Sequence, residues 1–347
     1  MLNFLKLIRY QNLLIIIITQ YVIRWFIIYP ILTYYNYDIT QISPYCPCLK
    51  TIHFQLQFSE INFFFLVLAT VLLAAGGYVI NDYFDRKTDL VNHPDSVIVD
   101  KTISSRMAIM LHIIFDAVAV LLGFYISYRI GHISLGLIFV LIAGILWFYS
   151  TSYKRQLLIG NFIVAILTAL VPLMVVIYEI PMLYNSYSTL DCNCKLLVDF
   201  NINKEYFSLI YSIKWSVFAF AFFAFIITLI REIVKDIEDL EGDQTYGRKS
   251  LPVVAGVYFS KIVVIILVVV TILSLAYIYY NFWDSINITF WYFLFALVLP
   301  MLFLIYKLIK ANNKKDFHFA SILIKIIMLL GLAYSLIIFF KLSFLLK

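Results

Sequence analysis

Long uninterrupted apolar runs constrain this chain more than any other feature of its sequence. A helix needs about 20 predominantly apolar residues to cross the hydrocarbon core of a bilayer. Runs of that length cover residues 12–34, 61–80, 107–128, 133–150, 158–180, 209–230, 257–280, 288–308 and 319–341. The sequence therefore predicts an all-α, polytopic membrane protein with nine transmembrane helices.

The composition supports this fold class and excludes others. Hydrophobic residues make up 63% of the chain and charged residues only 13%, whereas a soluble domain carries roughly 25% charged residues. A membrane β-barrel would show short alternating segments instead of long apolar runs. Nine helices with short connectors leave little chain for a separate soluble domain, so we expect one domain over residues 1–347.

The distribution of basic residues predicts the orientation. The net charge of +6 could indicate nucleic-acid binding, but the Lys and Arg residues flank the apolar runs and form no arginine-rich stripe. Most of them lie near the amino terminus or in connectors 81–106, 151–157, 231–256 and 309–318. Cytoplasmic loops carry such an excess of Lys and Arg. We therefore expect the chain in the cytoplasmic (inner) membrane, with its amino terminus and these connectors on the cytoplasmic side.

A first acidic motif follows the second apolar run. Asn81, Asp85 and Asp89 recur every four residues, so a helix places their side chains on one face. A solvated helix end is the simpler interpretation of such a charge run. However, like charges four residues apart repel, and carboxylates near a helix carboxyl terminus are disfavoured by the helix dipole. A bound cation would relieve both penalties.

A second acidic motif follows the sixth run. Glu232, Asp236, Asp239 and Asp243 again have helical spacing. Four crossings separate the two motifs, so both return to one side of the membrane and can converge. Carboxylates that leave room for phosphate and water suit Mg²⁺ better than Ca²⁺ or Zn²⁺. Basic residues on the same face favour a diphosphate ligand: Arg86, Lys87, Lys154, Arg155, Arg231, Lys235, Arg248 and Lys249.

These residues resemble the motifs of the UbiA superfamily of intramembrane prenyltransferases. Asn81-Asp-Tyr-Phe-Asp85-Arg-Lys-Thr-Asp89 is similar to that family's first aspartate-rich motif, and Asp239-Leu-Glu-Gly-Asp243 is similar to its second. The resemblance extends to Tyr149–Arg155 with Gly160 and Asn161, to Gly247–Pro252 and to the nine-span plan. It covers practically the whole chain.

The resemblance implies a helical bundle around a central cavity, in which two Mg²⁺ ions hold a polyprenyl diphosphate on the cytoplasmic side. The implied metal ligands are Asn81, Asp85 and Asp89 for one ion and Asp239 and Asp243 for the other, with Asp236 in support. Asp85, Asp89, Asp239 and Asp243 would be catalytic. The residues expected to bind the diphosphate or an acceptor phosphate are Asn81, Lys154, Arg155, Arg231, Lys235, Arg248 and Lys249.

The acceptor is the least constrained part of this prediction. The string Arg231-Glu-x-x-Lys235-Asp236 resembles the branch that prenylates geranylgeranylglyceryl phosphate, and two extra cations suit an anionic acceptor. An aromatic quinone precursor is the alternative acceptor, and cyclisation of the donor without an acceptor is a third possibility. A transporter or lipid-binding protein is the alternative of another class, although transporters hold ionisable groups near the bilayer midplane. We expect a lipophilic acceptor and the bilayer as partners, with neither nucleic acid nor a protein partner.

Three further groups carry predictions outside the motifs. Cys46/Cys48 and Cys192/Cys194 fall in connectors on the opposite face, where disulfides, a metal clip and free thiols are all open. Arg24 lies within the first run, so it should face the bundle interior, either in the site or beside a structural partner. His112 and Asp116 are four residues apart in the third run and are expected to pair with one another.

Overall fold

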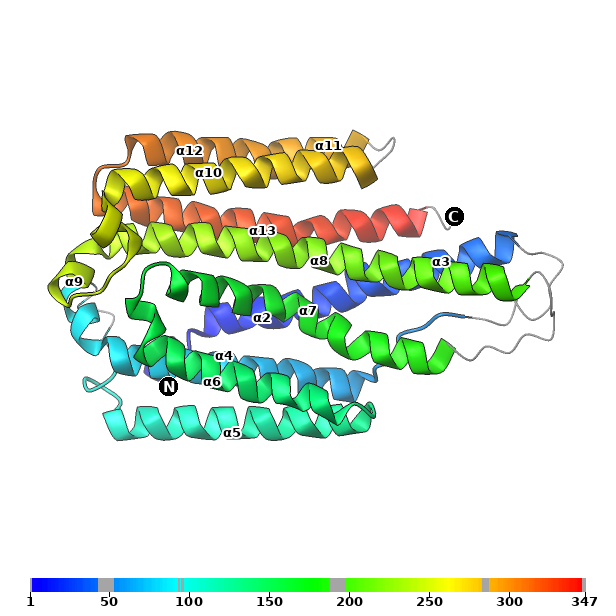
Figure 1. Ribbon diagram of the computed structural model, residues 1–347, viewed down its shortest axis with the longest axis horizontal. Coiled ribbons are helices and arrows are strands. Elements are labelled where there is room, and N and C mark those ends of the chain that lie inside the picture. The colour runs from blue at the N-terminus through cyan, green and yellow to red at the C-terminus, as the bar shows by residue number, and fades with distance from the viewer. Residues whose placement is uncertain are drawn as a thin grey trace.

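The computed structural model describes residues 2–42, 53–92, 94, 97–187, 198–282 and 287–344, and these fold into a bundle of long helices (Figure 1). The elements are α1 (Leu2–Leu7), α2 (Tyr10–Val22), η1 (Ile23–Ile28), α3 (Tyr29–Ile42), α4 (Glu60–Asn92), α5 (Ser105–Arg129), η4 (Ile133–Gly136), α6 (Leu137–Thr151), η5 (Tyr153–Arg155), α7 (Ile159–Tyr187), α8 (Val198–Glu238), α9 (Leu240–Thr245), α10 (Leu251–Phe282), α11 (Asn287–Tyr292), η6 (Phe293–Val298), α12 (Leu299–Lys310) and α13 (Lys314–Phe344).

Nine helical segments within the described ranges are long and apolar enough to cross a membrane, which confirms the predicted number. Each contains one predicted run almost entirely. The two largest differences are informative: the second helix continues from the predicted end at 80 to Asn92, and the sixth continues from 230 to Glu238. Both acidic motifs are therefore carried on helices. The predicted start of the seventh span at 257 follows a kink at Gly256, whose φ of 84° suits glycine.

The two helices that carry the motifs lie at the centre of the bundle. α4 packs against α5 and α6, while α8 packs against α7, α10 and α13. Among the nine spans, α4 and α8 have the largest buried shares. The carboxyl ends of both helices lie beside α9, on the left in Figure 1. We call this the motif end of the bundle.

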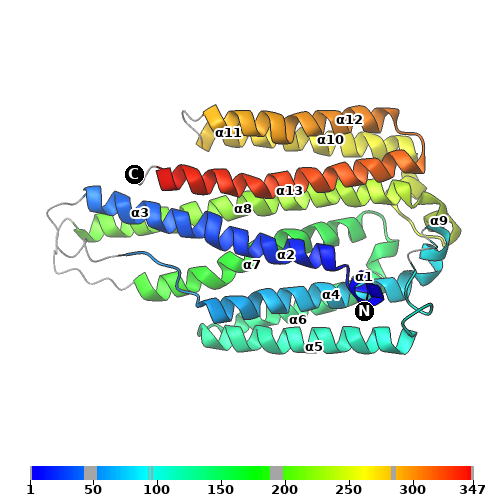
Figure 2. The ribbon, with the colours of Figure 1, turned by 180° about the vertical axis from the view of Figure 1, so that it is seen from behind.

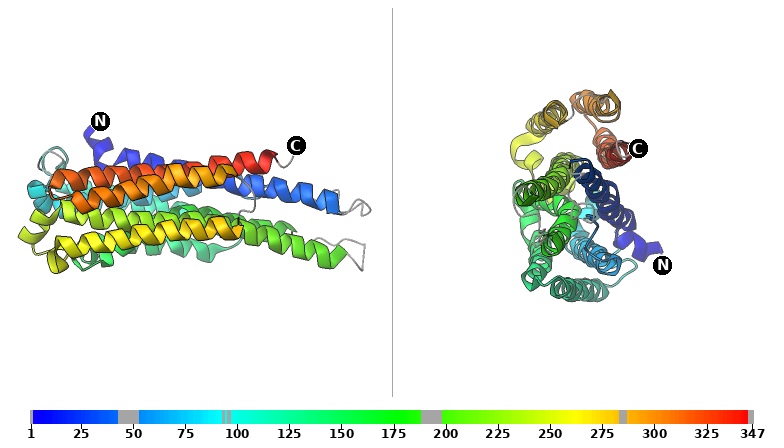
Figure 3. Two further views of the ribbon diagram at one scale, coloured as in Figure 1. Left: turned by 90° about the horizontal axis from the view of Figure 1, so that it is seen from above. Right: turned by 90° about the vertical axis from the view of Figure 1, so that its right-hand side faces the viewer.

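The remaining helices form the periphery. End-on, the pair formed by α10 and α12 lies at the edge of the bundle farthest from α5 (Figure 3). The amino terminus lies toward the motif end and the carboxyl terminus toward the other end (Figure 2), as an odd number of crossings requires. Many large apolar side chains on these outer helices are exposed, which is the surface that a lipid environment accepts.

Arg24 lies in an ionic cluster, which resolves the open question about its role. Its guanidinium lies 2.9 Å from carboxylate oxygens of both Glu60 and Glu179, and it also donates to the backbone carbonyl of Phe58. Glu179 in turn accepts from the backbone amides of Gln57 (2.6 Å) and Phe58 (3.2 Å). Arg24 therefore has structural partners and joins α4, α7 and the η1 segment.

The expected pairing of His112 and Asp116 is confirmed. His112 Nδ1 lies 3.5 Å from Asp116 Oδ2 and 3.2 Å from the carbonyl oxygen of Gly76 on α4, and its ring stacks on Trp147. The contact of His112 with Gly76 holds α5 against α4. The cysteine prediction concerns Cys46, Cys48, Cys192 and Cys194, which lie outside the described residues.

Candidate active site

A cavity of about 1080 Å³ opens at the motif end and continues into the bundle. Its polar part is lined by Asn81, Asp82, Asp85, Asp89, Lys154, Asn161, Arg231, Glu232, Lys235, Asp236, Asp239, Asp243 and Arg248. Its deeper part is lined by apolar side chains of α4, α6 and α7, among them Leu73, Ile142, Leu146, Leu167 and Met174. A ligand with a charged head and a hydrocarbon tail matches this division.

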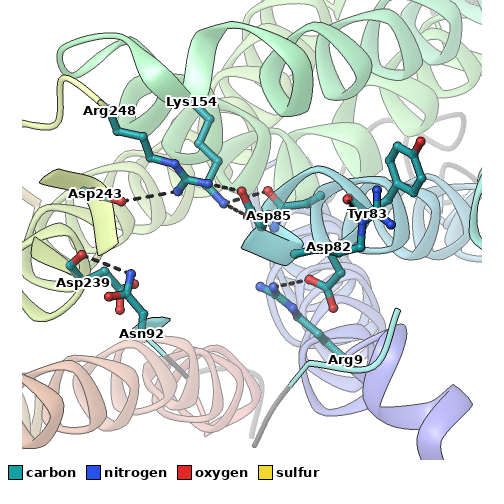
Figure 4. Close-up of polar contacts among 11 residues, drawn as sticks. Arg9, Asp82, Tyr83, Asp85, Asn92, Lys154, Asp239, Asp243 and Arg248 are labelled. Atoms are coloured by element: carbon teal, nitrogen blue, oxygen red, sulfur yellow. Dashed lines mark hydrogen bonds and ion pairs between the residues drawn. The ribbon is translucent and has the colours of Figure 1, made fainter. Parts of the chain in front are cut away.

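Asp85 is the centre of the polar part, and two cations hold it (Figure 4). Lys154 donates from Nζ to the carboxylate of Asp85 and, over 2.9 Å, to Oδ1 of Asn81. Arg248 donates to the other carboxylate oxygen of Asp85, and its second terminal nitrogen lies 3.5 Å from Asp243 Oδ1. A single guanidinium thus contacts both acidic motifs, which are 158 positions apart in the chain.

Two short connectors aim these cations into the cavity. Lys154 lies in the single turn η5 between α6 and α7, and Arg248 follows α9. The backbone amide of Lys249 donates to the carbonyl of Arg155 over 3.0 Å, so the connectors support one another. A Cβ on Gly160 would lie only 3.0 Å from Lys154 Cα. A small residue at that position therefore lets η5 pack against the start of α7.

The charges of the two cations are reinforced by their surroundings. Burial alone would lower the pKa of Lys154, but the carboxylate of Asp85 outweighs it, and the pKa is raised above its ordinary value. The same balance of burial against Asp85 and Asp243 raises the pKa of Arg248. Burial also raises the pKa of the Asp243 carboxyl. Lys154 and Arg248 are therefore cations at neutral pH.

Asn92, at the last position of α4, joins the two motifs through a second route. Its Nδ2 donates to the carbonyl of Asp239 (3.1 Å), and its Oδ1 accepts from the amide of Gly242 (2.9 Å). The sequence reasoning missed Asn92. Asn92 follows Asp89 by three residues and so lies near the same helical face, which is the signal that could have found it.

Two more polar pairs line the cavity wall. Asn161 on α7 donates to Asp236 Oδ2 on α8 over 2.8 Å. Arg9, just before α2, lies 2.8 Å from Asp82 on α4, and its guanidinium lies 5.0 Å from the centre of the Tyr78 ring. These pairs fix α7 to α8 and α2 to α4 around the cavity.

Comparison with known proteins identifies the family. The model of the UbiA prenyltransferase family matches residues 51–341. The chain belongs to the UbiA prenyltransferase family. It is therefore a membrane prenyltransferase, as the two aspartate-rich motifs predicted.

Several relatives of this chain are named digeranylgeranylglyceryl phosphate synthase. Digeranylgeranylglyceryl phosphate synthase from Methanosphaera stadtmanae is 30% identical over 75% of this chain and 82% of its own length. A solved digeranylgeranylglyceryl phosphate synthase structure has a TM-score of 0.54 and 22% identity, covering 96% of this chain and 98% of that one. A UbiA homologue from Archaeoglobus fulgidus bound to DMAPP and Mg²⁺ has a TM-score of 0.50 and 16% identity, covering 97% and 99%. At these identities the two structures show a shared fold.

The structure brings most of the predicted UbiA site residues to one cavity. Arg155 and Lys249 are exceptions, because both side chains are exposed and lie outside the cavity lining. The predicted residues that do line it are Asn81, Asp85, Asp89, Lys154, Arg231, Lys235, Asp236, Asp239, Asp243 and Arg248. Within the described ranges, no three acidic, His or Cys side chains are gathered as a metal site. Asp85 faces two bases instead, and the metal assignments remain predictions.

Proposed function

We propose that the protein transfers a prenyl group from a polyprenyl diphosphate to a glycerol phosphate lipid such as geranylgeranylglyceryl phosphate, in a Mg²⁺-dependent reaction. The observation that carries the proposal is the contact of Arg248 with both Asp85 and Asp243. It brings two acidic motifs and two cations to the polar end of an otherwise apolar cavity. The name of the Methanosphaera stadtmanae relative and its coverage support the choice of reaction.

The side chains at the polar end fit Mg²⁺. The donor atoms are carboxylate and amide oxygens, which are the protein ligands that Mg²⁺ prefers. We assign Asn81, Asp85, Asp89, Asp236, Asp239 and Asp243 as its ligands, and all of them line the cavity. The Mg²⁺ found with DMAPP in the Archaeoglobus fulgidus homologue supports this assignment. Bound Mg²⁺ would neutralise charge on the diphosphate and make it a better leaving group.

The chain's own residues have three tasks in this reaction. Lys154 and Arg248 stabilise the negative charge that grows on the diphosphate as its bond to C1 of the prenyl chain breaks. The apolar walls around Leu146 and Leu167 bind the tail and keep water from the allylic carbon. A hydroxyl oxygen of the acceptor then bonds to C1 as the diphosphate leaves, and a carboxylate of the polar part of the cavity accepts the hydroxyl proton.

Charge favours an anionic acceptor over a neutral phenol. Arg231 and Lys235 line the same cavity beyond the pair that holds Asp85. Phosphate recognition by Arg and Lys is strong because both can donate charged hydrogen bonds. We further propose that the motif end faces the cytoplasm, since the basic connectors lie on that side of the bundle.

The test is product formation by the purified protein. Labelled geranylgeranyl diphosphate and Mg²⁺ are incubated with geranylgeranylglyceryl phosphate or with a prenylatable phenol, and the product is identified by mass spectrometry. We expect the glycerol phosphate lipid to be prenylated and EDTA to stop the reaction. Arg248→Ala should lower kcat about 100-fold or more, while Lys249→Ala, whose side chain is exposed, serves as the matched control. Preference for the phenol, or no product with any acceptor, would refute the proposal.

A further inference from the structure

A second group of cations lies in the cavity beside the pair at Asp85. Arg231 and Lys235 come from α8, and Lys325 comes from α13, which packs against α8. Lys325 lies well inside the membrane-spanning part of α13, and its side chain is half-buried. In the described part of the chain, the side chain of neither Lys235 nor Lys325 forms a hydrogen bond or an ion pair. A cation is costly in such a position unless an anion accompanies it.

The neighbouring acids, Glu232 and Asp236, balance only part of this positive charge. Glu232 lies 2.8 Å from the guanidinium of Arg231 and is thereby paired. Arg231 and Lys235 lie near enough to repel the Lys325 ammonium, and Glu232 attracts it. Arg231 also keeps a buried donor, Nε, without a hydrogen-bond partner among the described residues. Two ammonium groups that form no hydrogen bond in the described part of the chain and an unused guanidinium donor thus line the same cavity.

An apolar slot begins next to these cations. A second cavity of about 360 Å³ runs between α2, α8 and α13, and its lining is mostly apolar. It shares Ile15, Ile16, Thr168, Val171 and Met328 with the main cavity, so the two cavities adjoin. Met328 follows Lys325 by about one helical turn and therefore lies on the same face of α13. Positive charge at the entrance of a hydrocarbon slot suits an amphiphile with an anionic head.

We propose that Lys325, together with Lys235 and Arg231, binds the phosphate of the acceptor lipid, and that the apolar slot holds the acceptor's hydrocarbon chain. This inference rests on the proposed function. The donor's diphosphate has its own place at Asp85 and Asp243, so the second cationic group is free for the acceptor. Lys supplies a compact charge and Arg a planar fork, which together suit a phosphate. Binding both lipids in adjoining cavities holds the acceptor hydroxyl near C1 of the donor.

The test compares Lys325→Met with Lys315→Met, a matched change at an exposed residue of the same helix that lies outside the cavities. KM is measured for geranylgeranylglyceryl phosphate, for geranylgeranyl diphosphate and for geranylgeranylglycerol, the acceptor without its phosphate. Loss of one charged hydrogen bond to phosphate should raise KM for the phosphorylated acceptor about 10-fold or more. KM for the donor and for geranylgeranylglycerol should stay within about two-fold, and Lys325→Arg should restore most of the affinity.

The outcomes separate the inference from the proposed function. If the wild-type protein prenylates no glycerol phosphate lipid, the proposed function fails and the inference fails with it. If the wild-type protein does so and Lys325→Met has an unchanged KM for that acceptor, only the inference is overturned. A rise in KM for the donor instead would assign Lys325 to the diphosphate and would also overturn it. Thermal unfolding of Lys325→Met should match or exceed the wild type, because the substitution removes a costly charge.

Discussion

The contact between Asn92 and Gly242 offers a sharp test of how the two motifs are held together. A Cβ placed on Gly242 would lie 2.4 Å from Asn92 Nδ2 and 2.6 Å from its Oδ1, which is closer than real Cβ contacts allow. The Gly242→Ala variant must therefore displace the Asn92 side chain. That displacement breaks both hydrogen bonds between the end of α4 and α9, and α9 carries Asp243.

The magnitude follows from the surroundings of these bonds. Asn92 is only 7% exposed, so water cannot readily replace its partners. Each hydrogen bond contributes about 1 kcal/mol net, and each buried group left without a partner costs about 1–3 kcal/mol. We expect Gly242→Ala to lower the free energy of unfolding by about 2–4 kcal/mol. Because Asp243 loses its support, the Mg²⁺ concentration needed for half-maximal activity should rise about 10- to 100-fold, as for other residues that orient metal ligands.

The assay combines thermal unfolding in detergent with Mg²⁺ titration of activity. Gly144→Ala is the matched control, because a Cβ added to Gly144 in α6 would meet no atom within 4 Å and alanine favours helix. Asn92→Ala should be about as damaging as Gly242→Ala, and the double variant should be little worse than either, since both remove the same contact. Unchanged stability and Mg²⁺ response in Gly242→Ala, or full additivity in the double variant, would refute the reasoning.

Two further predictions concern Lys154 in the cavity and the buried ion pair of Arg24 with Glu179. Lys154→Met should lower kcat about 100- to 1,000-fold at saturating substrate. Arg155 is the next residue and its side chain is exposed, so Arg155→Met should change kcat less than about two-fold. Equal losses of kcat in steady-state kinetics would contradict the role of Lys154 at the diphosphate. Arg24→Met leaves the carboxylate of Glu179 buried without its charge partner and should cost about 3–5 kcal/mol of stability. Thermal unfolding should show much of this loss recovered in Arg24→Met/Glu179→Leu, and no recovery would count against the buried pair.

The parts of the site that the sequence predicts are those set by helical geometry and by counting crossings. Asn81, Asp85 and Asp89 share a face because the helix continues through them, and this requires no knowledge of the fold. The return of the second motif to the same end of the bundle follows from an even number of crossings. The convergence of Asp85 and Asp243 could therefore be anticipated, although not the residue that joins them.

The parts that the sequence does not predict depend on turns and on pairings between distant helices. Lys154 and Arg155 are adjacent and chemically similar, yet only Lys154 enters the cavity, because one turn at η5 directs the two side chains differently. No spacing rule predicts which of two neighbouring bases in a turn points inward. The buried partner of Arg24, Glu179, is likewise 155 positions away, so only the packing of α7 beside η1 identifies it.

The arrangement of charges supports the proposal that the polar end of the cavity binds two anionic lipids. Around Asp85, acidic side chains outnumber Lys154 and Arg248. A diphosphate without bound metal would be repelled there, so it binds together with divalent cations. At the second cationic group, the three cations Arg231, Lys235 and Lys325 outnumber the two acids beside them, Glu232 and Asp236, so a phosphate can bind without a metal. The two anionic head groups are thus directed to different places by opposite local charge, and the space between those places is left for the acceptor hydroxyl to reach C1 of the donor.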